Sequence, residues 1–155
     1  MKKIFISLQH IDKKRVINII MEENVYTFSM IKPEAVKNNL TGKILSEIES
    51  NGFKIAKLRK ISMSYEQAQG FYESLREMPF YEELCKYMSS GSVIAMVLEK
   101  ENAVKDFREL IGATNPAEAR IGTIRRKYGL SKSQNAIHGS DSDKSAEREC
   151  RFFDL

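Results

Sequence analysis

The stretch Asn135-Ala136-Ile137-His138-Gly139-Ser140 contains the side chain best suited to covalent chemistry, because His138 is one of only two histidines in the chain. A short apolar pair precedes this histidine, and a charged helical pattern begins after it at about Ser142. This order predicts a strand, a tight turn and a helix N-terminus, whose exposed N–H groups favour anions such as phosphate. A histidine at that junction could be a nucleophile, a general base, a ligand or a polar strand end.

Cationic side chains occur at two other places from which they could reach a phosphate. Lys32 stands at the end of an alternating apolar run, and residues 112–134, which have almost no periodicity, contain Arg120, Arg125 and Arg126. A loop of that length inside a compact domain is usually functional. A neutral imidazole is a competent nucleophile, and arginines orient phosphate oxygens. These residues favour a phosphotransferase with a histidine nucleophile, in which positioning supplies most of the catalysis.

The elements that would position these residues alternate regularly along the chain. Apolar runs predict strands at 25–31, 53–61, 93–98 and 135–138. Helical patterns lie at 40–48, 64–77, 81–89, 102–112 and 142–152. Two β-α-β units in tandem favour an α+β fold, a ferredoxin-like split β-α-β sandwich whose four-stranded antiparallel sheet is covered by helices. A doubly wound parallel sheet is the alternative.

Positive charge is concentrated at the start of the chain. Residues 1–20 carry five basic side chains and one acidic one, which leaves 20 basic and 20 acidic residues in 21–155. The balanced remainder gives no reason to expect nucleic-acid binding. We expect residues 1–20 to be a flexible extension or the result of a misassigned start, and residues 21–155 to form a single domain.

Several classes of site and location are not supported by the sequence. Neither GxxxxGK[ST] nor GxGxxG occurs, so the common nucleotide-binding loops are not expected. Cys85 and Cys150 have no metal-ligand or CxxC spacing and are expected to be reduced thiols of a cytoplasmic protein. No apolar run reaches the ~18–20 residues that a membrane span needs, so no membrane association is expected.

Four segments together resemble the nucleoside diphosphate kinase family. The most specific is NAIHGSDS at 135–142, and the others are SMIKPEAV at 29–36, GATNPA at 112–117 and GTIR at 122–125. They occur in the family's order and spacing between about Tyr26 and Phe153. The resemblance implies a ping-pong reaction with nucleoside triphosphates and diphosphates as substrates. A nucleoside triphosphate, typically ATP, would give its γ-phosphoryl group to His138, and a nucleoside diphosphate would then accept it.

The resemblance also implies a role for individual residues. Glu149 matches a glutamate that orients the histidine so that its δ nitrogen attacks, and Ser140 matches a serine that contacts this glutamate and the phosphoryl region. Tyr72 matches a tyrosine bonded to the family's lysine, and Phe80 matches the aromatic side chain that stacks on the base. The residues that bind the phosphates and the ribose correspond to Lys32, Arg108, Thr114, Arg125 and Asn135. Mg²⁺ would arrive on the nucleotide phosphates, so no metal site built by protein side chains is implied.

Two departures from the family pattern lie beside the expected site. Ser92 stands where a proline is common, and Arg126-Lys127-Tyr128 replaces a more usual small, acidic and aromatic run. Either change could shift the rate or the metal preference. The end of the sequence soon after Phe153 resembles bacterial-type members, and the family implies a homo-oligomer built from dimers, either a tetramer or a hexamer.

Two other functions remain open at this stage. One is a nucleotide- or partner-binding module of the same fold that has lost catalysis. The other is a single-strand nucleic-acid binder that would use the basic residues 1–20.

Overall fold

The computed structural model describes residues 25–155, so the expectation about residues 1–20 lies outside the described residues. One sheet contains four strands in the order β2-β3-β1-β4, with bounds β1 Tyr26–Ile31, β2 Lys54–Ser62, β3 Ser92–Glu99 and β4 Ile137–Gly139. Every neighbouring pair is antiparallel. The ferredoxin-like α+β prediction is confirmed, and the parallel doubly wound alternative is wrong.

The central position of β3 follows from its unbroken apolar sequence. Ile94, Met96 and Leu98 face one hydrophobic cluster, whereas the residues between them face a second cluster on the other side of the sheet. Since side chains alternate across a strand, an apolar run of this kind suits a strand that is covered on both faces. By contrast, β2 lies at an edge and most of its side chains are exposed.

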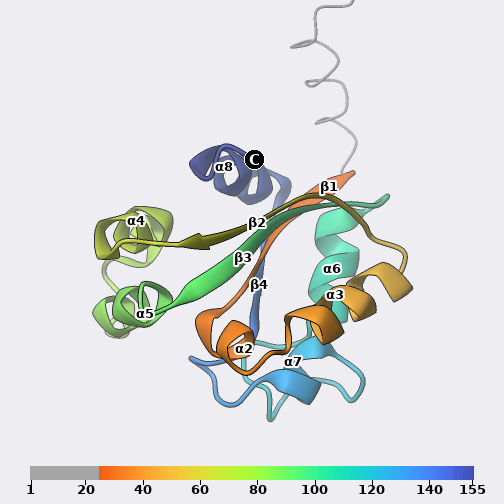
Figure 1. Cartoon of the computed structure of the whole chain (residues 1–155), viewed down its shortest axis with the longest axis horizontal. Helices are drawn as coiled ribbons and strands as arrows, with labels where there is room; N and C mark the ends of the chain where they lie inside the picture. The colour runs from red at the N-terminus through yellow and green to blue at the C-terminus, as the bar shows by residue number, and fades with distance from the viewer. Residues whose placement is uncertain (1–24) are drawn as a thin grey trace, which may run out of the picture.

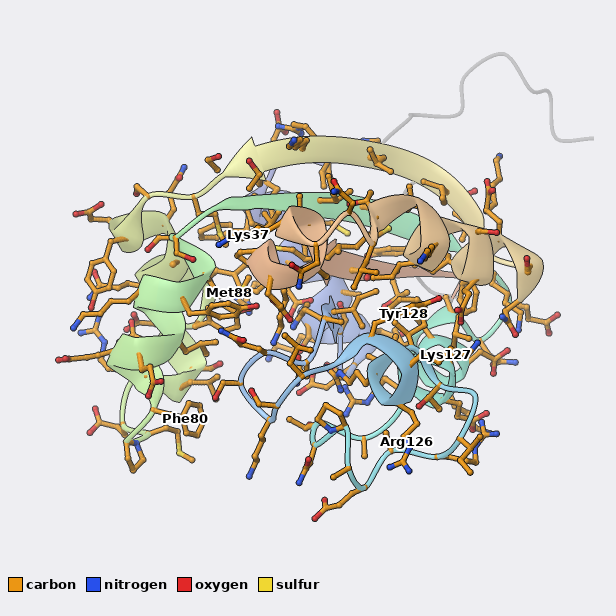
Figure 2. The ribbon with its side chains drawn as sticks, turned by 60° about the horizontal axis from the view of Figure 1, so that its bottom comes forward. Lys37, Phe80, Met88, Arg126, Lys127 and Tyr128 are labelled. Carbon is orange, nitrogen blue, oxygen red and sulfur yellow. The ribbon has the colours of Figure 1, made fainter. Side chains whose placement is uncertain are left out.

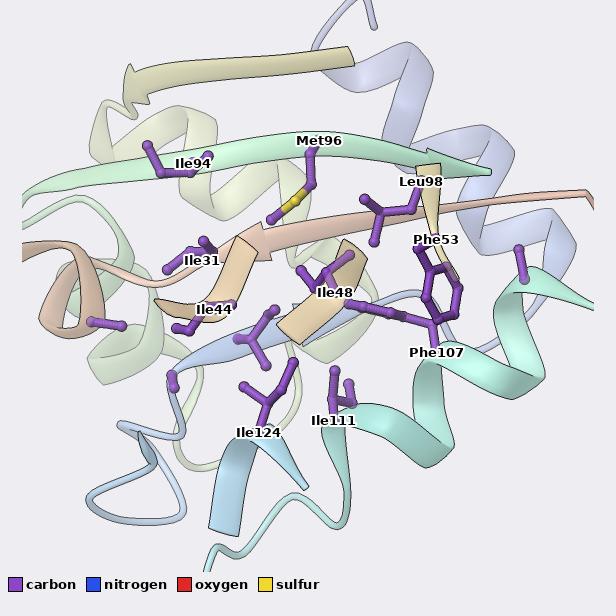
Figure 3. Packing of buried hydrophobic residues seen from close by; sticks show 14 residues of the cluster. Ile31, Ile44, Ile48, Phe53, Ile94, Met96, Leu98, Phe107, Ile111 and Ile124 are labelled. Atoms are coloured by element: carbon purple, nitrogen blue, oxygen red, sulfur yellow. The ribbon is translucent and has the colours of Figure 1, made fainter. Parts of the chain in front are cut away.

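Helices cover both faces of the sheet (Figure 1). The first cluster is packed by α3 (Thr41–Ser50), α6 (Ala103–Ile111) and α7 (Ile124–Tyr128). Figure 3 shows Ile44 near Ile31 of β1, and Phe107 beside Phe53 at the other end of the cluster. The second cluster is packed by α4 (Tyr65–Phe71), α5 (Tyr81–Met88) and α8 (Asp143–Phe152). The sheet is thereby held rigidly between two apolar layers.

Local side-chain hydrogen bonds set the starts of α4 and α8. The Ser64 hydroxyl accepts from the Gln67 N–H while the Gln67 side chain accepts from the Ser64 N–H, which completes the capping box at α4. The Ser142 hydroxyl accepts from the Ser145 N–H at the start of α8. The helix predicted over 64–77 is wrong in its length, because α4 ends at Phe71 and a 3₁₀ turn, η2 (Glu73–Leu75), follows it.

The sequence pattern does not predict two short helices, α2 (Pro33–Lys37) and α7. Both have five residues, which is too short for an apolar stripe to be recognised. The start of α7 is fixed by the Thr123 hydroxyl, which accepts from the Arg126 N–H. The expectation of an irregular segment over 112–134 is therefore wrong at its centre. Among residues 25–155, no helix has the length and apolar character needed to cross a membrane.

Candidate active site

A cavity of about 550 Å³ lies between the α4–α5 pair on one side and the loops around α7 on the other. Figure 2 shows Phe80 on the α4–α5 side and Arg126, Lys127 and Tyr128 on α7. Nine of the ten residues singled out by the family resemblance line this cavity: Lys32, Tyr72, Phe80, Arg108, Thr114, Arg125, Asn135, His138 and Glu149. The tenth, Ser140, is fully buried and hydrogen-bonds to Glu149.

His138 lies on β4 with one ring nitrogen held close to a carboxylate. Its Nε2 is 3.0 Å from Glu149 Oε1, in a contact too bent to count as a well-formed hydrogen bond. The ring of Phe71 packs edge-on against the imidazole, with the ring centres 5.4 Å apart. Because the two nitrogens lie on opposite sides of the ring, Nδ1 points away from Glu149. Nδ1 is therefore the ring nitrogen that does not lie against Glu149.

Glu149 is itself held in place inside the protein. Its Oε2 accepts a 2.5 Å hydrogen bond from the Ser140 hydroxyl, and its side chain is 5 % exposed. The guanidinium of Arg148 lies 3.9 Å from Oε1. A buried carboxylate with a fixed donor on one oxygen keeps the other oxygen in a constant direction. The orientation of the imidazole thus depends on Glu149 of α8 and on Ser140, which directly follows β4.

A strained turn immediately precedes His138 and consists of Asn135, Ala136 and Ile137; we refer to it as the 135–137 turn. The Ile137 N–H donates to the Asn135 carbonyl at 2.9 Å, and Ala136 has a φ of 73°. A three-residue turn with a positive central φ is rare and unfavourable for a residue with a β-carbon. Because of this turn, the strand begins later than predicted: β4 starts at Ile137 rather than at 135.

Contacts from the end of β1 hold the 135–137 turn in place. The Lys32 N–H donates to the Ala136 carbonyl at 2.9 Å, and Glu34 Oε1 accepts from the Ala136 N–H at 2.8 Å. Sequence reasoning missed Glu34, although it lies inside the recognised SMIKPEAV segment. The one signal available was an acid two residues after Lys32, and nothing in the sequence indicates that it meets Ala136.

Two buried cations lie next to each other in the wall of the cavity. Burial, with the nearby charge of Arg125, lowers the pKa of Lys32 to about 8, while Glu34 acts in the opposite direction. Burial, with the charge of Arg108, lowers the pKa of Arg125 to about 10. Cations that are disfavoured in this way are stabilised when an anion binds beside them. The electrostatics of the cavity therefore suit a polyanion such as a nucleotide phosphate.

The guanidinium of Arg125 is fixed by backbone carbonyls. Its Nε and Nη2 donate to the Ile137 carbonyl at 3.2 and 2.8 Å, and Nη1 donates to the Gly112 carbonyl at 3.0 Å. These bonds leave part of the donor fork facing the cavity that Arg125 lines. They also join the 112–134 segment to β4, next to His138.

Some polar atoms of the side chains around these cations lack a hydrogen-bond partner among the described residues. The Asn135 amide donates to the carbonyls of Thr114 and Lys132, while its Oδ1 is buried and has no partner within residues 25–155. The Tyr72 hydroxyl is likewise buried and unpartnered among the described residues. The expected bond from Tyr72 to Lys32 is therefore absent from this structure. Tyr72 instead packs edge-on against His138, and burial, with the charge of Glu149, raises its pKa.

The unusual residues Arg126, Lys127 and Tyr128 do not line the cavity. Arg126 donates to the Ala117 carbonyl at 2.8 Å. Lys127 and Tyr128 both bind Glu47 of α3, at 3.0 and 2.7 Å. These side chains tie α7 to a neighbouring loop and to α3. Ser92 begins β3, where its hydroxyl lies 3.3 Å from that of Ser62 on β2.

Comparisons with known proteins identify the family to which the chain is similar. The family model described as nucleoside diphosphate kinase matches residues 25–154. A nucleoside diphosphate kinase of Geobacter sp. (strain M21) is 55 % identical over 127 residues, which cover 82 % of this chain and 93 % of that relative. One of Persephonella marina is 50 % identical, with 82 % of this chain and 91 % of the relative covered.

A solved structure extends the comparison to the fold. The crystal structure of the Aquifex aeolicus nucleoside diphosphate kinase superposes with a TM-score of 0.81 at 43 % identity, covering 83 % of this chain and 94 % of that one. The family model, the sequence identities and the superposed fold all indicate the same family. The chain belongs to the nucleoside diphosphate kinase family.

Proposed function

We propose that this chain transfers the γ-phosphoryl group of a nucleoside triphosphate to a nucleoside diphosphate in two steps through His138. The observation that carries the proposal is the position of His138 at a cation-lined cavity with its Nε2 against Glu149 and its Nδ1 facing away from it. This arrangement supplies a nucleophile, a group that orients it and a place for phosphate.

In the first step, His138 Nδ1 attacks the γ-phosphorus of the triphosphate. The bond from this phosphorus to the oxygen that bridges to the β-phosphate breaks, and its electron pair leaves with the nucleoside diphosphate. The imidazole gains positive charge as the N–P bond forms, and the Glu149 carboxylate beside Nε2 stabilises that charge. In the second step, a terminal β-phosphate oxygen of a different nucleoside diphosphate attacks the phosphorus of the phosphohistidine, and the N–P bond breaks with its electron pair returning to Nδ1, which regenerates His138.

We assign phosphate binding to the cationic wall of the cavity. Lys32 and Arg125 are buried there, and Arg108 and Thr114 are exposed at the same cavity. Asn135, with an unpartnered Oδ1, would reach the ribose hydroxyl together with Lys32. Phosphoryl transfer depends mainly on such positioning and charge stabilisation.

Phe80 is proposed to stack on the nucleotide base. It is a large apolar side chain that is 45 % exposed, and it lines the cavity on the α4–α5 side. Stacking uses the π-face that every base has, so it supports a broad range of bases.

The cavity suits a metal ion that enters with the nucleotide. Within residues 25–155, no group of three or more His, Cys, Asp or Glu side chains is arranged to hold a metal. The charged side chains on the phosphate-binding wall are cationic and offer no ligand to a metal, so Mg²⁺ would be held by the phosphate oxygens of the nucleotide. Mg²⁺ bound to the nucleotide would offset the negative charge of the phosphate oxygens.

We further propose a homo-oligomer built from dimers, with residues 21–155 as one catalytic domain in the cytoplasm. The exposed edge strand β2 and the exposed apolar side chains of Leu58, Ile121 and Leu130 support self-association.

Cys85 and Cys150 are both buried and unpaired, which agrees with a reducing compartment.

The direct test incubates the purified protein with γ-labelled ATP and Mg²⁺ and then adds unlabelled GDP. The proposal predicts an acid-labile, base-stable label on the protein that leaves as GTP. Nucleotide binding without any retained label would contradict it and would favour the binding module that has lost catalysis. A salt-sensitive gel shift that disappears when residues 1–20 are deleted would support the nucleic-acid alternative.

A further inference from the structure

We propose that Glu34 is a positioning residue for the transfer reaction, because its buried carboxylate holds the 135–137 turn and thereby fixes the location of His138. The inference rests on the role of His138 proposed above. Glu34 does not line the cavity, so it would act through the backbone rather than on the nucleotide.

The contact joins two distant parts of the chain. Glu34 is 9 % exposed and lies in the first turn of α2, and its Oε1 accepts from the buried Ala136 N–H at 2.8 Å. The Ala136 carbonyl accepts from the Lys32 N–H at 2.9 Å. Both backbone polar groups of Ala136 are therefore bound by residues of the β1–α2 junction.

The 135–137 turn needs such support because its conformation is unfavourable by itself. Ala136 adopts a φ of 73°, which few residues with a β-carbon adopt unless the surroundings enforce it. A carboxylate is a stronger acceptor than a neutral oxygen, and a buried one leaves the N–H no competing water. The Glu34 bond is thus well suited to hold Ala136 in place.

A movement of this turn would displace two parts of the site together. His138 follows the turn directly, and the Ile137 carbonyl accepts two donors from Arg125. Loss of the Glu34 contact would therefore shift both the nucleophile and the cation that we assign to the phosphates. Small displacements of this kind reduce rates strongly, since transfer depends on alignment.

Glu34 also contributes a negative charge that raises the pKa of Lys32. The groups that act on Lys32 are Arg125 on α7, which disfavours its ammonium form, and Glu34 on α2, which favours it. The second carboxylate oxygen, Oε2, is buried and has no partner within the described part of the chain. Glu34 thus has two separable contributions, a hydrogen-bond acceptor for the turn and a charge for Lys32.

Stabilisation of α2 does not account for the side-chain geometry. An acid in the first turn of a helix commonly interacts with the helix's own N–H groups. Here α2 has only five residues, and Glu34 accepts its hydrogen bond from Ala136 in the 135–137 turn instead.

The two contributions can be separated with Glu34→Gln and Glu34→Ala in the full chain. Glutamine keeps an oxygen acceptor at the same reach but removes the charge, whereas alanine removes both. Ile48→Val, in the core of α3, serves as the control for a general loss of stability. The readouts are kcat and KM for each half-reaction across pH, thermal unfolding, and amide hydrogen exchange at Ala136.

We expect Glu34→Ala to lower kcat by about 10- to 100-fold and to speed exchange at the Ala136 amide, while Ile48→Val changes neither. Glu34→Gln should recover most of kcat but raise the nucleotide KM, and more so at pH 8 than at pH 6. Unchanged kcat or unchanged Ala136 exchange in Glu34→Ala would overturn the proposal. Equal loss of kcat in both variants would overturn it too. Amide exchange at Ala136 can be measured whether or not the protein is active, so it tests this inference independently of the proposed function. Failure of the proposed function would instead appear as wild-type protein that retains no label from ATP.

Discussion

The two edges of the sheet differ in almost every respect. The β4 edge has three residues, is mostly buried, follows a strained turn and contacts side chains from β1, α7 and α8. The β2 edge has nine residues, is mostly exposed and carries lysines and an arginine. The candidate site therefore lies at the short edge, where other elements fix each group, whereas the long edge is the one at which we propose self-association. Four substitutions or conditions test this division.

The largest effect is expected at β4. His138→Ala should reduce phosphoryl transfer to background, because no other described histidine is present to act as nucleophile, and it should leave the fold intact. The assay is label transfer from ATP to GDP, with thermal unfolding as the check on folding. Lys57→Ala on the exposed β2 strand is the matched control and should remain active. Normal turnover in His138→Ala would refute the mechanism.

Arg125→Ala should be the next most severe change. It removes both a phosphate-binding cation and the bonds to the Ile137 carbonyl, so we expect kcat to fall by about 100-fold or more, with base tolerance kept. Arg126→Ala removes a neighbouring arginine that lies outside the cavity and should have a much smaller effect. An unchanged kcat in Arg125→Ala would place that residue outside the site.

The pH dependence of nucleotide binding should report the burial of Lys32. Its pKa is lowered from 10.5 to about 8 in the free protein, and a bound phosphate would favour the protonated form. Nucleotide affinity should therefore fall as pH rises through about 8, with proton uptake on binding that calorimetry in two buffers can measure. Lys32→Gln should abolish that uptake, and identical uptake in both proteins would contradict this account.

The lowered pKa of Lys32 also determines how the free energy of unfolding changes with pH. Between about 8 and 10.5 the unfolded chain binds more protons at Lys32 than the folded one does. This group alone therefore makes the free protein more stable as pH rises through that window.

The smallest effect on chemistry is expected at β2. Leu58 is 45 % exposed on this strand, so Leu58→Lys should weaken self-association while leaving the active-site geometry unchanged. Light scattering should show a smaller particle, and kcat per chain should change by no more than about twofold. A loss of kcat as large as that in Arg125→Ala would show that the two edges are not independent.

The sequence allowed the fold and most of the candidate site to be predicted because their signals are local. The unbroken apolar run of β3, the capping box at Ser64 and the segment around His138 each lie within a few residues. The family resemblance, which rests on four segments, then named ten residues, four of which lie outside those segments. The structure gathers nine of those ten residues around one cavity.

The features that could not be predicted depend on distant contacts or very short elements. The bond from Glu34 to the Ala136 N–H joins residues 102 positions apart, and no local pattern indicates it. The helix α7 is too short for periodicity, and the positive φ of Ala136 would normally suggest glycine. The expected Tyr72–Lys32 bond does not form because Tyr72 packs against His138 instead.

The account rests most directly on which nitrogen of His138 becomes phosphorylated. Phosphorus-31 and nitrogen-15 NMR of the protein, labelled at histidine and treated with ATP and Mg²⁺, distinguishes the two ring nitrogens. The contact between Nε2 and Glu149 predicts a single phosphohistidine, at His138, with phosphorus bonded to Nδ1. Phosphorus on Nε2, or on any other residue, would contradict the proposed orientation of the catalytic histidine.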